Sequence, residues 1–97
     1  MAAGYLVVDV HVSNPDQFKH YQALAPTAVA AAGGEYVVRG GRSEALEGDW
    51  LPQRTTVVRF PSYEQAKAFY DSALYRAARA KRAGATAHFN MVLVEGV

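Results

Sequence analysis

The chain has 97 residues, a formal net charge of +1 and no cysteine. The length predicts one domain over residues 1–97, and the near-neutral charge gives no general attraction to nucleic acid or to an anionic membrane surface. The lack of cysteine excludes disulfides, cysteine nucleophiles and thiolate metal ligands, and it fits a cytoplasmic protein. No apolar run approaches the roughly 20 residues that span a membrane, and no secretory signal is expected at the N-terminus.

The first half of the chain predicts a strand, a long helix and a second strand. Residues 5–12 are mostly β-branched and apolar, with polar interruptions spaced by two, as strands often are. A polar pair before Pro15 can cap a helix that runs to about residue 32 and is stopped by Gly33 and Gly34. Residues 35–39, EYVVR, predict the second strand.

The glycine-rich stretch GGEYVVRGGRSEALEGDW, residues 33–50, has two interpretations. Glycine-rich loops that bind phosphate follow a strand and lead directly into a helix. Here the glycines flank a strand and lead, through a loop over 40–53, into a further strand over 54–60. The stretch is therefore interpreted as the turns on either side of a hairpin strand.

The second half predicts one helical region and a final strand. Ser62 and Gln65 have the spacing of a capping box, and Gly84 ends the helical region that follows. Residues 88–94, HFNMVLV, predict the fourth strand. The order β-α-β-β-α-β is that of a ferredoxin-like α+β fold, a four-stranded antiparallel sheet with two helices on one face. From right-handed crossovers we expect the first and third strands to lie side by side and parallel at the centre, each with an antiparallel outer neighbour.

Five segments of the chain carry recognisable motifs: NPDQFKHY (14–21), GGEYVVRGG (33–41), LEGDW (46–50), RFPSYEQAKAFYDSALY (59–75) and VLVEGV (92–97). In this order and spacing they resemble the domain of unknown function 1330 family, and the resemblance covers nearly the whole chain. The resemblance implies a dimeric α+β barrel, in which the sheets of two copies face each other, and it implies no reaction. Members of the family often carry a proline after the serine of an S-x-x-Y element. Here Ala73 follows Ser72, so we expect a weaker break in the second helix.

Strand alternation predicts a polar face on the sheet, away from the helices. One register that turns the apolar residues of the first and fourth strands toward the helices pairs Asp9 with Asn90 and His11 with His88. By the same alternation, the residues predicted on the polar face are Asp9, His11, Glu35, Arg39, Arg59, His88 and Asn90. A homodimer that closes two sheets into a barrel would cover this face and protect the apolar edge strand.

The set Asp9, His11 and His88 has two interpretations. Two histidines and one carboxylate are a known ligand set for metal ions. The same residues are also an ordinary polar cluster inside or at the rim of a barrel, and from the sequence we prefer this interpretation because the register is assumed. Neither a metal ion nor a cofactor is therefore predicted. The third histidine, His20, is expected to face solvent on the first helix.

Aromatic and arginine side chains indicate a cleft between the sheet and the helices. The candidates are Tyr21, Arg39, Trp50, Arg54, Tyr70 and Tyr75. The aromatic candidates could line such a cleft, or they could belong to the core. The two arginines flank the hairpin loop, where they could bind a carboxylate between them or pair with the acidic residues of the loop.

These features lead to three functional hypotheses. The leading one is a homodimer that binds a small anionic or aromatic metabolite in the sheet–helix cleft. The second, suggested by similarity to other dimeric barrels, is a cofactor-independent oxygenase or isomerase. The third is a purely structural or interaction dimer. The basic residues over 75–82 are interpreted as a solvated helix end rather than a nucleic-acid surface, and no membrane contact is expected.

Overall fold

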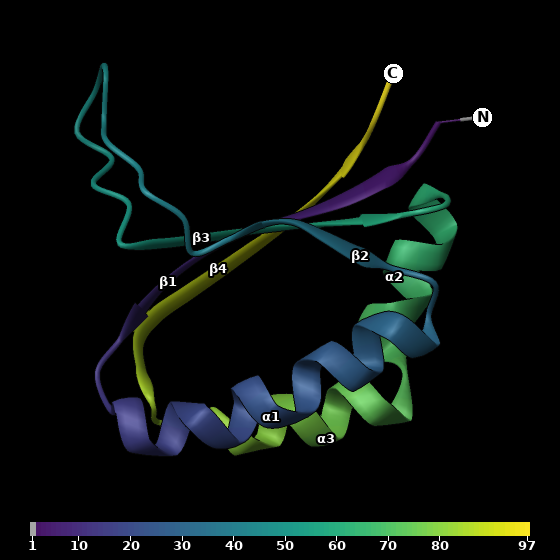
Figure 1. Cartoon of the computed structure of the whole chain (residues 1–97), viewed down its shortest axis with the longest axis horizontal. Helices are drawn as coiled ribbons and strands as arrows, with labels where there is room; N and C mark the ends of the chain where they lie inside the picture. The colour runs from purple at the N-terminus through teal and green to yellow at the C-terminus, as the bar shows by residue number, and fades with distance from the viewer. Residues whose placement is uncertain (1) are drawn as a thin grey trace.

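The computed structural model describes residues 2–97 as a four-stranded sheet whose three helices all lie on one face (Figure 1). The elements, in chain order, are β1 (Gly4–Val12), α1 (Pro15–Ala31), β2 (Glu35–Arg39), β3 (Arg54–Phe60), α2 (Tyr63–Asp71), α3 (Ala73–Lys81) and β4 (Thr86–Glu95). The strand order is β2-β3-β1-β4, and every neighbouring pair is antiparallel. The predicted ferredoxin-like α+β fold is confirmed. We refer to the face of the sheet opposite the helices as the open face.

The direction of the two central strands differs from the expectation. β1 and β3 lie side by side at the centre of the sheet, as predicted, but they are antiparallel. The prediction of parallel strands was wrong because it left out the effect of the hairpin. α1 returns the chain so that β2 runs in the same direction as β1, and the loop after β2 then reverses the chain for β3.

The register between β1 and β4 is the predicted one. Asp9 pairs with Asn90 and His11 pairs with His88, and the register shifts only beyond His11, at Val12. The buried apolar residues of β1 are Leu6, Val8 and Val10. Because these residues face the helices, the alternating side chains of Asp9 and His11 point to the open face.

An irregularity in β2 turns Arg39 to the side of the sheet opposite to the predicted one. Glu35 pairs with Arg59 on the open face, but the register shifts in mid-strand, so that Arg39 pairs with Thr56. Thr56 is on the helix side, since it lies two residues before the buried Val58. An extra residue in one strand reverses the side to which the following side chains point. The prediction that Arg39 lies on the polar face was therefore wrong.

The second helical region is broken at Ser72, where the extended backbone (φ −68°, ψ 153°) separates α2 from α3. The Ser72 hydroxyl oxygen accepts a hydrogen bond from the Tyr75 backbone N–H at 3.2 Å. The same hydroxyl donates to the Phe69 carbonyl at 2.7 Å. One side chain thus provides a hydrogen-bond partner both for a carbonyl group at the end of α2 and for an N–H group at the beginning of α3. The expectation of a weaker break without proline was wrong, because the capping serine stops the helix by itself.

The main core lies between the sheet and the helices. In this core the ring centroid of Phe69 lies 5.0 Å from that of Phe60 and 4.5 Å from that of Tyr75. Leu6 of β1 and Val29 of α1 belong to the same cluster. Full burial of an apolar side chain of this size contributes about 1.5–3 kcal/mol. This cluster fixes the distance between α1 and the sheet, and with it the walls of the cavity beside it.

Candidate functional site

A cleft opens between α1 and the sheet, and it encloses a cavity of about 60 Å³. Its apolar walls include Leu6, Val8, Val10, Val58, Phe69 and Met91. Gln22 and Pro26 of α1 line the cleft from the other side. Because proline has no N–H, the Gln22 carbonyl oxygen lacks its usual donor one turn later in the helix. The cleft therefore has an apolar interior and a small number of polar groups.

Two arginines, Arg39 and Arg54, line this cleft from the two ends of the hairpin loop. Gly40 (φ 66°) leaves room for Arg54, since a Cβ at this position would lie 2.8 Å from Nη1 of that residue. Within residues 2–97, no carboxylate oxygen lies within 4.0 Å of either guanidinium group. The acidic residues of the loop over 40–53 are therefore not their partners. The guanidinium carbon of Arg39 lies 4.4 Å from the ring centroid of Tyr36, and neither arginine is neutralised by a carboxylate.

Three tyrosines add hydroxyl groups to the cleft. The hydroxyls of Tyr21 and Tyr75 lie 2.8 Å apart and form a hydrogen bond. Burial raises the pKa of Tyr21 far above its ordinary value, and the neighbouring Tyr75 raises it further. Burial also raises the pKa of Tyr36, although the positive charge of Arg39 acts in the opposite direction. Tyr21 and Tyr36 are therefore neutral hydrogen-bonding groups at neutral pH.

The two remaining aromatic candidates, Trp50 and Tyr70, lie outside this cleft. Trp50 is 59% exposed and reaches the open face, where its Nε1–H donates to Oδ2 of Asp9 at 3.2 Å. Tyr70 lies on α2 beside a separate hollow between the helices and β4. There the guanidinium carbon of Arg79 lies 4.3 Å from its ring centroid. The predicted candidates that the structure brings together in the cleft are Tyr21, Arg39, Arg54 and Tyr75.

Two residues that line the cleft, Tyr36 and Thr56, are not among the sequence candidates. The signal for both is the alternation of the strands. Thr56 lies two residues before Val58, which faces the helices, and Tyr36 pairs with Val58 across β2 and β3. Applying period two to every position of these strands would have placed both side chains in the cleft.

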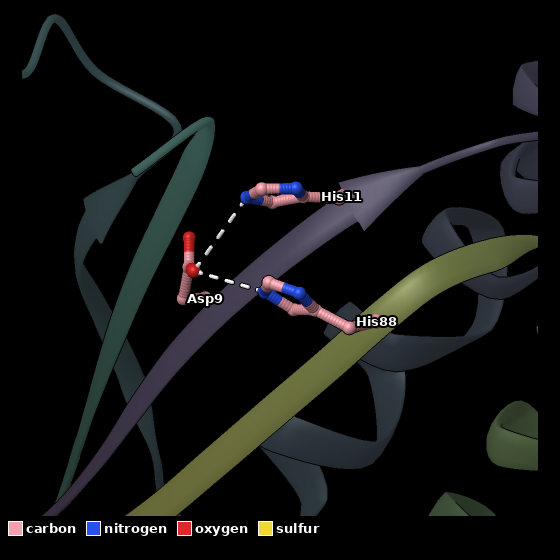
Figure 2. A group of neighbouring side chains, drawn as sticks. All are labelled: Asp9, His11 and His88. Carbon is pink, nitrogen blue, oxygen red and sulfur yellow. Dashed lines mark hydrogen bonds and ion pairs between the residues drawn. The ribbon is translucent and has the colours of Figure 1, made fainter. Parts of the chain in front are cut away.

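The open face carries a second cluster, in which Asp9, His11 and His88 lie together (Figure 2). Nε2 of His88 lies 3.2 Å from Oδ2 of Asp9, and Nε2 of His11 lies 3.9 Å from the same oxygen. The two imidazole rings stack, with centroids 4.0 Å apart and an interplanar angle of 28°. Asp9 is only 6% exposed. The predicted polar cluster is thus assembled around a buried carboxyl group.

The surroundings of Asp9 favour its ionised form. Burial by itself raises the pKa of this carboxyl group. The hydrogen bonds from His88 and Trp50, together with the positive charge that His11 and His88 carry when protonated, lower it by more. The net result is a pKa below the ordinary value, so the group is a carboxylate at neutral pH.

The other polar candidates do not join this cluster. Arg59 forms an ion pair with Glu35 at 3.1 Å, and both side chains are largely exposed. Solvent screens such an exposed pair, so it contributes little to stability. Asn90, opposite Asp9 in β4, is exposed at the surface of the open face. Of the predicted polar residues, His11 and His88 lie within 4.0 Å of the Asp9 carboxylate.

Two further observations concern the outer surface. At the end of α3, the guanidinium carbon of Arg82 lies 3.6 Å from the ring centroid of Phe89, and Arg79 packs on Tyr70. These charges are therefore held against aromatic rings of the same chain.

In the part of the chain that the structure describes, no helix has the length and apolar character needed to cross a membrane.

The sequence matches a family model described as "Domain of unknown function (DUF1330)" over residues 3–97. The chain belongs to this family. The resemblance noted in the sequence motifs is thereby confirmed, and DUF1330 membership assigns no reaction. Among curated proteins, none matches the chain.

Solved structures with the same fold include three from bacteria. A protein of unknown function from Rhodopseudomonas palustris has a TM-score of 0.76 and 17% identity, over 99% of this chain and 83% of that one. A dimeric ferredoxin-like protein of unknown function from Jannaschia sp. CCS1 has a TM-score of 0.72 and 12% identity, over 95% and 97%. A "putative antibiotic biosynthesis monooxygenase" from Caulobacter crescentus CB15 has a TM-score of 0.64 and 14% identity, over 99% and 91%. At these identities the likeness shows the fold alone.

Proposed function

We propose that this DUF1330 protein binds a small organic anion in the cleft between α1 and the sheet. The observation that carries the proposal is the pair Arg39 and Arg54, which line an otherwise apolar cleft and have no carboxylate partner within 4.0 Å in residues 2–97. A guanidinium group binds a carboxylate through two parallel hydrogen bonds, and such charge-assisted bonds are about twice as strong as neutral ones.

The shape of the cleft limits the ligand. For comparison, a cavity needs about 10–15 Å³ to hold one water molecule, and a dry cavity of about 150 Å³ holds benzene. A cavity of about 60 Å³ therefore admits a short apolar chain or the edge of one ring. The ligand's carboxylate would lie near the arginines, and its apolar end would lie among Val8, Val10 and Tyr75.

A matched ligand series tests this proposal. We expect short carboxylates to raise the melting temperature, and primary alcohols with the same carbon skeleton to leave it unchanged. At a ligand concentration of about 100 times Kd the stabilisation is about 2.7 kcal/mol, which corresponds to a shift of about 10–20 °C for a domain of this size. Arg39→Gln and Arg54→Gln should each reduce this shift.

The control for these variants is Arg42→Gln, which removes a charge from the same hairpin loop at a residue that does not line the cleft. This variant should keep the full shift with carboxylates. The proposal fails if no carboxylate stabilises the folded protein. It also fails if all three arginine variants respond alike, since the effect would then be one of general charge.

We also propose that a second copy of the chain covers the open face. Val92 and Val94 of β4 point to that face and are 56% and 45% exposed, and exposed apolar side chains on an edge strand favour association. The Jannaschia neighbour is itself described as dimeric. The homodimer is either a ligand-binding protein or a purely structural or interaction dimer. The ligand series above separates these two possibilities.

A further inference from the structure

The open-face cluster offers a site of a different chemistry from the cleft. We propose that Asp9, His11 and His88 bind one divalent transition-metal ion, through the carboxylate and the two imidazole Nε2 atoms. One ligand atom from each of the three side chains lies within 4.8 Å of the other two. Sequence reasoning preferred an ordinary polar cluster because the register was assumed. The structure supplies that register, and it brings the three donors together.

The backbone holds these three donors in a fixed arrangement. Asp9 and His11 are two residues apart on β1, so their side chains leave the same face of the sheet. His88 pairs with His11 across the antiparallel β1–β4 ladder, which places the two side chains next to each other. All three Cα positions therefore belong to one hydrogen-bonded ladder, between the central strand β1 and the edge strand β4, and small side-chain rotations are enough to adjust the ligands.

The distances are close to those of a metal site. Two ligand atoms at about 2.1 Å from the same ion lie about 3.0–3.4 Å apart, depending on the coordination angle. The separation between Nε2 of His88 and Oδ2 of Asp9 is 3.2 Å, and that between Nε2 of His11 and the same oxygen is 3.9 Å. A small rotation of the His11 side chain, within its present rotamer, would bring its Nε2 into the same range of distances. In Figure 2 both imidazole rings present a nitrogen to the same carboxylate.

Two polar atoms of the cluster lack partners, and this makes a cation favourable. Oδ1 of Asp9 and Nε2 of His11 are buried and have no hydrogen-bond partner in the described chain. A buried polar atom without a partner destabilises the folded protein. A single metal ion bound by the two imidazoles and by both oxygens of the Asp9 carboxylate would give both atoms a partner.

The donor set also indicates the class of ion. Two imidazole nitrogens and one carboxylate suit zinc, iron or cobalt, whereas calcium and magnesium prefer oxygen ligands. Trp50 provides an outer-shell contact, since its Nε1–H donates to Oδ2 of Asp9 and orients the carboxylate. In the single chain the side chains of His11 and His88 are 25% and 42% exposed, so an ion can reach them before a second copy covers the open face.

Cobalt(II) is the probe for this site, because its visible absorption bands report coordination directly. The full chain is freed of metal with a chelator, dialysed and titrated with Co²⁺. We expect bands that saturate at one ion per chain and that Zn²⁺ removes by displacement. His11→Ala and His88→Ala should lose the bands at stoichiometric Co²⁺. Trp50→Phe should keep them with an affinity lower by about 10–100-fold, the effect typical of losing an outer-shell partner.

The matched control is His20→Ala, which removes the exposed histidine of α1. It should bind Co²⁺ like the original protein. A second measurement needs no variant of the cluster: in imidazole ¹⁵N spectra of the original protein, Zn²⁺ should shift the ring nitrogens of two histidines and leave those of His20 in place. The proposal is overturned if the folded protein gives no Co²⁺ bands and no such shifts, or if His20→Ala abolishes either signal.

Discussion

At the scale of single residues, the hydroxyl pair of Tyr21 and Tyr75 connects α1 to α3 inside the wall of the cleft. Removing one hydroxyl leaves the other buried without its partner, which costs about 1–3 kcal/mol, whereas removing both leaves no unpaired group. We therefore expect Tyr21→Phe and Tyr75→Phe each to lower the free energy of unfolding by about this amount. The double variant should lose less than the sum, as measured by urea denaturation. Strictly additive losses would contradict this account.

The buried hydroxyl of Tyr21 also makes stability depend on alkaline pH. Burial raises its pKa, so the folded protein keeps a proton that the unfolded chain releases near the ordinary tyrosine pKa of about 10. The stabilisation is complete below this pH and decreases as the pH rises, because the unfolded state then binds fewer protons than the folded state. We expect the free energy of unfolding to fall above about pH 10, and to fall less steeply in Tyr21→Phe. Equal slopes in urea denaturation across this range would count against the prediction.

At the scale of elements, the break at Ser72 makes a stabilising substitution possible. Ala73 is the first residue of α3, and Ser72 before it has the extended backbone that proline requires of its predecessor. Ala73→Pro should therefore raise the free energy of unfolding by about 0.4–1 kcal/mol, because it restricts the unfolded chain. The control is Ala77→Pro in the middle of the same helix, which should cost about 3 kcal/mol. The free energy of unfolding of both variants is measured by chemical denaturation. A destabilised Ala73→Pro variant would contradict the expectation that the backbone at the break accepts proline.

The elements also show which features the sequence could predict. The observed β1–β4 register is one of those that the alternation of Asp9 and His11 against two apolar faces allows, since a slip of one residue would bury the polar set under the helices. The position of Arg39 did not follow, because EYVVR contains no glycine or proline to mark the irregularity, and the shift arises from pairing with β3. The break at Ser72 was underestimated because proline was considered and the capping hydroxyl was not.

The two candidate sites were predictable to different degrees, because alternation along a strand can be seen in the sequence whereas loop paths and strand irregularities cannot. The polar cluster depends only on strand alternation, which the sequence shows, and on one register, which had to be assumed. Trp50 joins that cluster from a loop whose path the sequence does not specify, so its contact with Asp9 could not be foreseen. The cleft required the correct side for Arg39, and this depended on the irregular residue in β2.

At the scale of the whole molecule, the proposed homodimer gives a direct prediction. Light scattering on a size-exclusion column should give twice the chain mass of 10.5 kDa. Val92→Glu places a charge in the middle of the proposed contact on the open face and should shift the protein to the monomer. Leu46→Glu is the control, because Leu46 is an exposed apolar residue of the hairpin loop. A monomeric original protein, or a Val92→Glu variant that stays dimeric, would contradict the proposed interface.

The alternation of β1 has a consequence for how members of this family diverge. Val8 and Val10 line the cleft, while Asp9 and His11 belong to the cluster on the other side. Neighbouring codons therefore belong to two different sites, and a mutation at one position leaves the other site's chemistry intact. A descendant lineage could lose the histidines and keep the proposed anion cleft, or change the cleft and keep the histidines. The two properties are inherited on one strand, yet selection can act on each of them separately.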